Sequence, residues 1–187
     1  MSKVIPFEER AVAALRDRLG AVNSVNEDLI AFARGHSGAT AAIHSAVLAL
    51  MEADSLDALF DVVRHDWPRL LGLDYAALAL VADGRGFRVE AAYIGTVEPR
   101  IVDRAIGQIE PVTMRSVACG HPLFGTTARD VRSEALIMLP SEAPLPYGLL
   151  LLGQKDAAPL DNRNGTELLG FLGASLSAML RRWLMNG

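Results

Sequence analysis

The chain has 187 residues, enough for one domain and an extension. Its 18 basic and 22 acidic residues give a net charge of −4. A nucleic-acid groove needs a basic surface, so this balance argues against a nucleic-acid partner. Hydrophobic residues make up 51% of the chain and charged residues 21%, which predicts a folded core rather than disorder.

The sequence shows no sign of a membrane anchor, a leader or a disulfide framework. No apolar run reaches the ~18–20 residues of a membrane span. The N-terminal stretch MSKVIPFEER lacks the apolar core of a signal peptide. The single cysteine, Cys119, excludes an internal disulfide and an all-cysteine metal site. We therefore expect a cytoplasmic protein with no membrane partner, no metal and no other cofactor.

The first predicted element is a long helix with a dimer seam. Apolar residues recur at heptad spacing from Val12 to Leu50, as in a left-handed coiled coil. Asn26 lies at one core position of this heptad, and the two facing Asn26 side chains would favour a parallel dimer. Gly35 and Gly38 are unfavourable inside a helix, so the helix could end between them. The alternative is two short amphipathic helices packed on their own domain. The predicted seam residues are Leu15, Leu19, Val22, Asn26, Leu29, Ile43, Val47 and Leu50.

The next predicted elements are a helix and two strands. Asp54-Ser55 supplies an N-cap for a helix over Leu56–Leu71, which Gly72 ends. Asp74–Ala82 is apolar on both faces and predicts a central strand. A turn at Asp83–Gly86 and an alternating segment, Phe87–Ile94, predict an antiparallel partner.

The second half is less regular in its middle and clearer at its end. We expect a short helix near residues 100–108, a strand near 111–115 and a loop over 119–125. Residues 134–139 and 148–154 predict two strands, and Gly165-Thr166 precedes a last amphipathic helix. Short turns between neighbouring strands indicate an α+β fold, an antiparallel sheet with helices on one side. The expected division is a helical dimerisation segment, 1–53, and a domain, 54–187.

Several C-terminal landmarks resemble a known family. They are Leu123-Phe124-Gly125, Val131–Pro140 with Arg132-Ser133, Gly148–Asp156, Gly165–Leu169 and Arg182-Trp183-Leu184. Their order, over roughly Ala46 to Leu184, resembles a proteobacterial, GAF-related family, number four-eight-four of the domains of unknown function. Its members usually begin with a histidine-proline-aspartate-phenylalanine motif, which this chain lacks. The resemblance implies a GAF-like sheet flanked by helices, the fold of small-molecule sensors.

In such a fold the irregular middle segment would cover one sheet face and close a pocket. Arginines beside hydroxyls and aromatic rings could bind a small anionic or aromatic ligand. The alternative is a filled core, with the arginines solvated or paired to Glu98, Asp103, Glu110 and Asp130. The candidate ligand residues are Tyr93, Arg115, His121, Phe124, Thr126, Arg129 and Arg132.

No motif predicts catalysis. His65-Asp66 lacks the further histidines and aspartates of a two-metal phosphohydrolase, and Cys119-Gly120-His121 lacks an orienting acid. The favoured hypothesis is a non-enzymatic, homodimeric sensor or regulatory module in signalling, with an unknown small molecule as possible ligand. The alternative from another class is a protein–protein adaptor whose GAF-like core is filled and ligand-free.

Overall fold

The computed structural model describes residues 37–91, 93–139, 146–157 and 163–186. The chain divides into two compact units, Met1–Gly38 and Ala39–Gly187, and the sheet and both of its cores belong to the second. The predicted coiled-coil seam from Leu15 to Leu29 lies outside the described residues, as does Gly35. In the described part of the chain, no helix is both long and apolar enough to cross a membrane.

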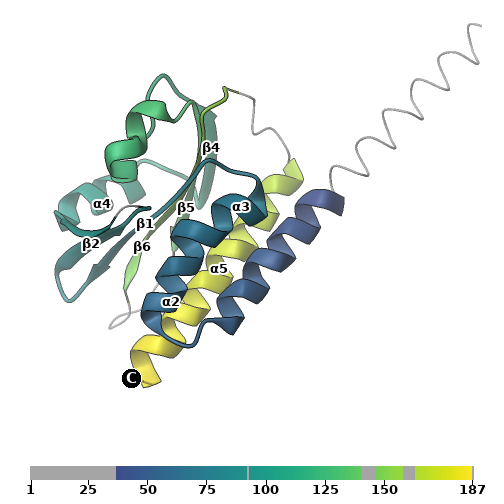
Figure 1. The fold of residues 1–187 in the computed structure, drawn as a ribbon. Helices are drawn as coiled ribbons and strands as arrows, with labels where there is room; N and C mark the ends of the chain where they lie inside the picture. Colours follow the sequence, from purple (N-terminus) through teal and green to yellow (C-terminus); the bar gives the residue numbers. More distant parts are fainter. Residues whose placement is uncertain (1–36, 92, 140–145, 158–162, 187) are drawn as a thin grey trace, which may run out of the picture. The chain divides into compact units, whose positions relative to one another are not determined.

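A six-stranded antiparallel sheet forms the centre of the second unit (Figure 1). Its strand order is β3-β2-β1-β6-β5-β4, so β1 and β6 are the middle pair. The register pairs Leu78 with Val89 of β2 and with Leu150 of β6. The strands are β1 (Tyr75–Ala82), β2 (Arg85–Val89), β3 (Ile94–Val97), β4 (Val112–Ser116), β5 (Ser133–Leu139) and β6 (Tyr147–Gln154). This arrangement confirms the predicted α+β class and the central position of the 74–82 strand.

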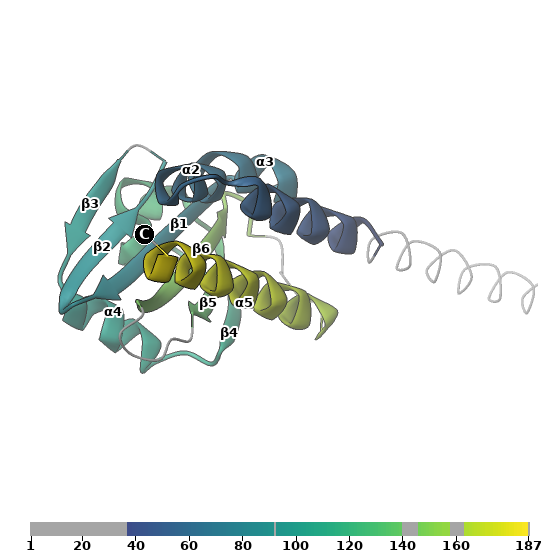
Figure 2. The ribbon, with the colours of Figure 1, turned by 90° about the horizontal axis from the view of Figure 1, so that it is seen from below.

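Helices cover both faces of the sheet. A helix over residues 37–52 lies with α2, α3 and α5 on one face, where it runs alongside α5 (Figures 1 and 2). The other face is covered by α4 and η2. The expectation of helices on one side only was therefore incomplete. The bounds are α2 (Leu56–Asp61), a π-helical turn η1 (Val62–Asp66), α3 (Trp67–Leu71), α4 (Pro99–Ile106), a 3-10 segment η2 (Pro122–Asp130) and α5 (Arg163–Asn186).

Local chemistry explains where these elements begin and end. The Ser55 hydroxyl accepts a hydrogen bond from the Ala58 amide at 3.1 Å, which confirms the predicted N-cap of α2. Gly72 ends α3 with a left-handed φ of 65°. The β1–β2 turn shrinks to Asp83-Gly84, whose φ values of 50° and 72° suit a two-residue hairpin. The predicted Phe87–Ile94 strand instead ends at Val89, and Ile94 begins β3.

The two sides of the sheet contribute to separate cores because side chains alternate along a strand. In β1, Leu78 and Leu80 face the helical layer of α2, α3, α5 and the 37–52 helix, whereas Ala77 and Ala79 face α4 and η2. Every interior position of β1 is buried. That double burial is why the segment reads as apolar on both faces.

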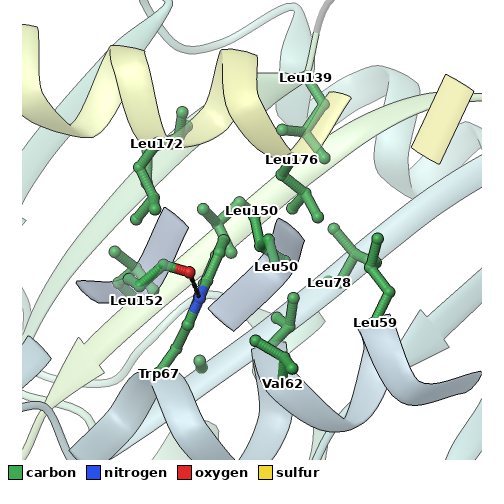
Figure 3. Close-up of a cluster of buried hydrophobic side chains, with 14 of the residues drawn as sticks. Leu50, Leu59, Val62, Trp67, Leu78, Leu139, Leu150, Leu152, Leu172 and Leu176 are labelled. Atoms are coloured by element: carbon green, nitrogen blue, oxygen red, sulfur yellow. Dashed lines mark hydrogen bonds between the residues drawn. The ribbon is translucent and has the colours of Figure 1, made fainter. Parts of the chain in front are cut away.

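The core of the helical layer centres on Trp67 (Figure 3). Its ring is fully buried among leucines that include Leu50, Leu152 and Leu172, and its indole N–H donates to the Ala46 carbonyl at 3.0 Å. This bond joins α3 to the 37–52 helix. That helix is therefore part of the same core as the sheet.

Candidate functional site

The structure disperses most of the predicted ligand residues. Phe124 is 0% exposed and lies in the core beneath η2. The Arg132 guanidinium donates to the backbone carbonyls of Arg129 and Val131, at 2.6 and 3.0 Å, so it ties down its own loop. Arg129 itself is exposed. Tyr93 is exposed near the β2–β3 connection. Within the described part of the chain, none of these four residues lines the surface hollows found there.

The sheet face beneath α4 and η2 is filled with apolar side chains. The buried members of this core are Ala77, Ala79, Val81, Val102, Ala105, Leu123, Phe124, Ala128, Val131, Leu136, Leu149 and Leu151. Close packing is visible at Gly153, where an added Cβ would lie 3.1 Å from the ring of Phe124. The packing favours the filled-core alternative for this face.

A buried carboxylate organises Arg115 and His121. Glu134 is 1% exposed, and its Oε1 accepts a hydrogen bond from Arg115 Nε at 2.8 Å. Its Oε2 accepts one from the His121 amide at 2.7 Å. Arg115 and Glu134 face each other across β4 and β5 in the register of the sheet. Glu134 thus holds the start of η2 against the strands, and the Arg115 charge is engaged within the fold.

A second buried carboxylate, Glu90, holds the middle of η2, the segment that forms the cover of this sheet face. Glu90 is 2% exposed and forms an ion pair with Arg88 at 2.9 Å. Its Oε2 accepts hydrogen bonds from the Thr126 amide and hydroxyl, at 3.2 and 3.4 Å. Arg88 also donates to the Tyr93 hydroxyl at 2.8 Å. Thr126 and Tyr93 are therefore brought together, but around an ion pair that stabilises the fold.

The sequence interpretation missed both carboxylates. Glu90 comes two residues after Arg88 and directly after the end of β2, and this spacing was a usable signal for an i,i+2 ion pair. Glu134 carried a weaker signal, because only the β4–β5 register puts it opposite Arg115. The partners predicted for the arginines were Glu98, Asp103, Glu110 and Asp130. In the described structure Arg115 pairs instead with Glu134, and Glu98 pairs with Arg100, which was not one of the candidate arginines.

His121 does lie at a concave site. It lines an open hollow of about 510 Å³ between α4 and the start of η2. The other lining residues are Arg100, Ile101, Arg104, Ala105, Gln108 and Pro122. Arg100 and Arg104 are four residues apart, so they share one side of α4, and Gln108 follows in the turn after this helix. The sequence predicted a helix here but not the hollow beside it, because His121 on the opposite wall comes from a distant segment of the chain.

The His121 ring is held in one tautomer. Its Nδ1 accepts a hydrogen bond from the Leu123 amide at 3.2 Å, capping η2, so the neutral ring carries its proton on Nε2. Burial lowers the pKa of His121 below its ordinary value, while the Glu134 charge raises this pKa and the Arg115 charge lowers it again. The neutral ring is therefore the form that the fold stabilises.

A pH series is expected to expose this preference. The unfolded His121 titrates near pH 6.5, and its folded pKa is lower. Between these two values the unfolded chain binds more protons, so the stability that His121 contributes is complete above about pH 6.5 and is lost as the pH falls toward the folded pKa. His121→Asn keeps an acceptor for the Leu123 amide but cannot titrate.

The measurement is the free energy of unfolding in urea at pH 7.5 and pH 5. Wild type should lose more stability than His121→Asn between these pH values, whereas His121→Ala should lose about 1 kcal/mol of cap energy at pH 7.5. Equal losses in wild type and His121→Asn would contradict the preference for the neutral ring. All other titrating groups are common to both chains, so they cancel in the comparison.

The described part of the chain shows no built metal site. No three His, Cys, Asp or Glu side chains gather there closely enough to hold an ion. Cys119 is exposed, and its Sγ lies 3.4 Å from the Ala128 carbonyl oxygen. Cys119 and His121 therefore have separate partners, in Ala128 and in Leu123.

The described end of the predicted dimer seam packs on its own chain. Ile43 and Leu50 are buried in the helical-layer core, and Val47 is partly buried against it. The exposed apolar residues of the same helix are instead Leu48 and Met51, 58% and 60% exposed. Dimerisation through the seam stays a prediction. The surface available on this helix lies on its opposite side.

The comparisons with known proteins agree with the architecture. A family model described as "Protein of unknown function, DUF484" matches residues 1–185, further toward the N-terminus than the expected 46–184. No curated protein matches the sequence. Similar solved structures are GAF domains of a phosphoenolpyruvate-protein phosphotransferase from Coxiella burnetii and of a sensor histidine kinase from Pseudomonas syringae pv. tomato. Each has a TM-score of 0.56 and 13% identity, and the matches cover 78% and 84% of this chain and 94% and 95% of those chains.

A third similar structure is a far-red absorbing protein in its dark state with bound biliverdin IXa. It has a TM-score of 0.56 and 13% identity over 76% of this chain and 99% of that chain. These likenesses establish the GAF fold that the sequence predicted. They concern the backbone arrangement alone, so the role of this chain is inferred from its own residues.

Proposed function

Because the chain belongs to the DUF484 family and has the GAF fold, we propose that it is a non-enzymatic regulatory module that forms a homodimer through its helical layer. The observation that carries this proposal is the apolar solvent side of two neighbouring helices. Leu48 and Met51 are exposed on the 37–52 helix, and Phe171 is exposed on α5. Large apolar side chains grouped on one surface are typical of interaction sites.

A second copy is the partner that best fits this surface. Leu48 and Met51 lie one turn apart, so both face the same direction. Around a two-fold axis the 37–52 helix of one copy would contact the same helix of the other copy. The Leu48/Met51 strip of each copy would then bury that of its partner. The heptad predicted for Leu15–Leu29 precedes this strip in the sequence and lies outside the described residues. Ile43 and Leu50 are already engaged in the core.

Two introduced negative charges test the dimer. In Leu48→Glu/Met51→Glu, like charges would meet across the two-fold axis at a cost of several kcal/mol. The dimer dissociation constant should therefore rise by about a hundredfold or more. Sedimentation equilibrium at micromolar concentration measures it. Ile101→Glu, on exposed α4 at the other face of the sheet, is the control and should leave the dimer intact. A monomeric wild type, or a double variant that stays dimeric, would refute the proposal.

The chemistry of the cover supports a role without catalysis. Its two buried carboxylates are both held by donors, Glu90 by Arg88 and Thr126, and Glu134 by Arg115 and His121. A general base would need a position beside a bound substrate. These two instead fasten the cover to the sheet.

A second candidate function is a ligand-free adaptor, and the filled sheet face favours it. If the domain acts only through protein contacts, the purified protein should carry no small molecule. Native and denaturing mass spectrometry of one preparation separate the two readings. Extra mass that disappears on denaturation supports a ligand-binding sensor, whereas equal masses per subunit favour the adaptor.

A further inference from the structure

The hollow between α4 and the start of η2 gathers nitrogen donors that the fold leaves unused. Within the described residues, Arg104 makes no ion pair or hydrogen bond. Arg100 is paired with Glu98, but its side chain is 82% exposed, and such exposed pairs contribute little and exchange readily. Asp103, between the two arginines, accepts a hydrogen bond from Tyr147 at 2.7 Å. It is therefore occupied away from the hollow.

The opposite wall adds a donor whose tautomer is set by a hydrogen bond. His121 lines the hollow, and its Nδ1 is occupied by the Leu123 amide. Its Nε2 therefore carries a hydrogen that can be donated. Gln108 contributes an amide N–H₂ at the end of α4. Two cations and two neutral donors thus border the same space, a set suited to a compact oxyanion with several acceptor atoms.

The charged groups that line the hollow are cationic: among the described residues, its lining includes Arg100 and Arg104 and no carboxylate. Of the nearby carboxylates, Glu98 is paired with Arg100, and Asp103 accepts the hydrogen bond from Tyr147. Behind His121, the Glu134 charge is matched by Arg115 at 2.7 Å. An anion entering from solvent therefore meets the arginines first, whereas Glu134 is 1% exposed and neutralised.

The remaining lining is apolar. Ile101 and Pro122 are exposed at the hollow, and Ala105 forms part of its floor. Its volume, about 510 Å³, is within the range of small-molecule sites, about 300–1,000 Å³. The space is larger than a bare oxyanion requires, and an apolar group attached to the anion could lie on Ile101 and Pro122.

We propose that this hollow binds the phosphoryl group of a small phosphorylated molecule, with Arg100, Arg104, Gln108 and His121 as its donors. The site is on the outer side of the cover, separate from the filled sheet face. It rests on the proposed regulatory role, for which it names the class of ligand. The ligand would join α4 to the start of η2, two segments that belong to different connections of the sheet.

The test is binding of two probes, inorganic phosphate and phenyl phosphate, to the full chain at pH 7.5. Isothermal titration gives the affinity, and the His121 ring ¹⁵N signals report contact at the site. Arg104→Glu reverses a charge that has no partner in the described fold, so it should leave folding intact. It should raise the phenyl phosphate dissociation constant by about tenfold or more. Arg181→Glu makes the same charge change on exposed α5, at the other face of the sheet, and should change it less than twofold.

We expect phenyl phosphate to bind more tightly than inorganic phosphate, both to shift the His121 Nε2 signal, and both affinities to fall with added salt. Unchanged binding in Arg104→Glu, or an unmoved His121 signal, would overturn the site. Equal affinity for the two probes would overturn the apolar part of the recognition. Sedimentation of the same samples distinguishes the two proposals. A dimer that does not bind phosphate would refute the site alone, and a monomer that binds phosphate would refute the dimer alone.

Discussion

Trp67→Ala is expected to lower the free energy of unfolding by about 3–5 kcal/mol, the range measured when large aromatic side chains are removed from cores. The ring is fully buried among leucines of the sheet, α5 and the 37–52 helix, so the cavity would open where all three meet. The change also removes the 3.0 Å hydrogen bond to the Ala46 carbonyl. Urea unfolding followed by circular dichroism measures the loss.

Trp67→Phe is the matched variant for this site. It removes the indole hydrogen bond, which is worth about 1 kcal/mol, but keeps most of the buried ring. Its loss should lie clearly between those of wild type and Trp67→Ala. A loss below about 1 kcal/mol for Trp67→Ala would contradict a shared core. The 37–52 helix would then be a separate unit, as the expected boundary at residue 53 implies.

Gly125→Ala is expected to destabilise the cover of the sheet by roughly 3 kcal/mol. Gly125 has φ 64° and ψ −127°, a conformation that costs other residues about 1–3 kcal/mol. An added Cβ would also lie 2.2 Å from Glu90 Oε2. Glu90 cannot move away freely, because it is buried and bonded to Arg88 and Thr126, and charged hydrogen bonds contribute about 1.5–3 kcal/mol each.

Gly84→Ala separates the two contributions. Gly84 also has a positive φ, 72°, but nothing lies within 4 Å of the position where its Cβ would be. It should lose only about 1–2 kcal/mol, from backbone strain. Adding Glu90→Ala to Gly125→Ala should cost less than the sum of the two single changes, because the clash is then removed. Additive losses in urea unfolding would show that Glu90 does not determine the residue at position 125.

The two buried carboxylates hold η2 in a defined position on the sheet. Glu134 fastens the beginning of η2 through the His121 amide, and Glu90 fastens Thr126 in its middle. The proposed phosphoryl site uses the outer side of this fastened segment. The proposed dimer surface lies on the helices at the opposite face of the sheet. Communication between them would pass through β1, β5 and β6, whose alternate residues belong to both cores.

The amino-acid sequence by itself determined the order and type of most elements. Alternating and doubly apolar segments are local patterns, and they placed β1, β5, β6 and α5 nearly within their observed bounds. Ser55 and Gly72 mark their helix ends by the chemistry of single residues. The landmarks from Phe124 to Trp183 likewise indicated the family and the GAF fold without any contact being known.

Tertiary structure alone decided which side chains meet. Arg115 and Glu134 are 19 residues apart, and only the β4–β5 register makes them partners. The heptad through Ile43 and Leu50 was read as a dimer seam, but the same spacing equally suits a helix packed on its own sheet, and there those residues are buried. His121 and Arg104 line the same hollow because η2 and α4 cover the same sheet face. Periodicity specifies a buried face, whereas the partner of that face depends on contacts between distant segments.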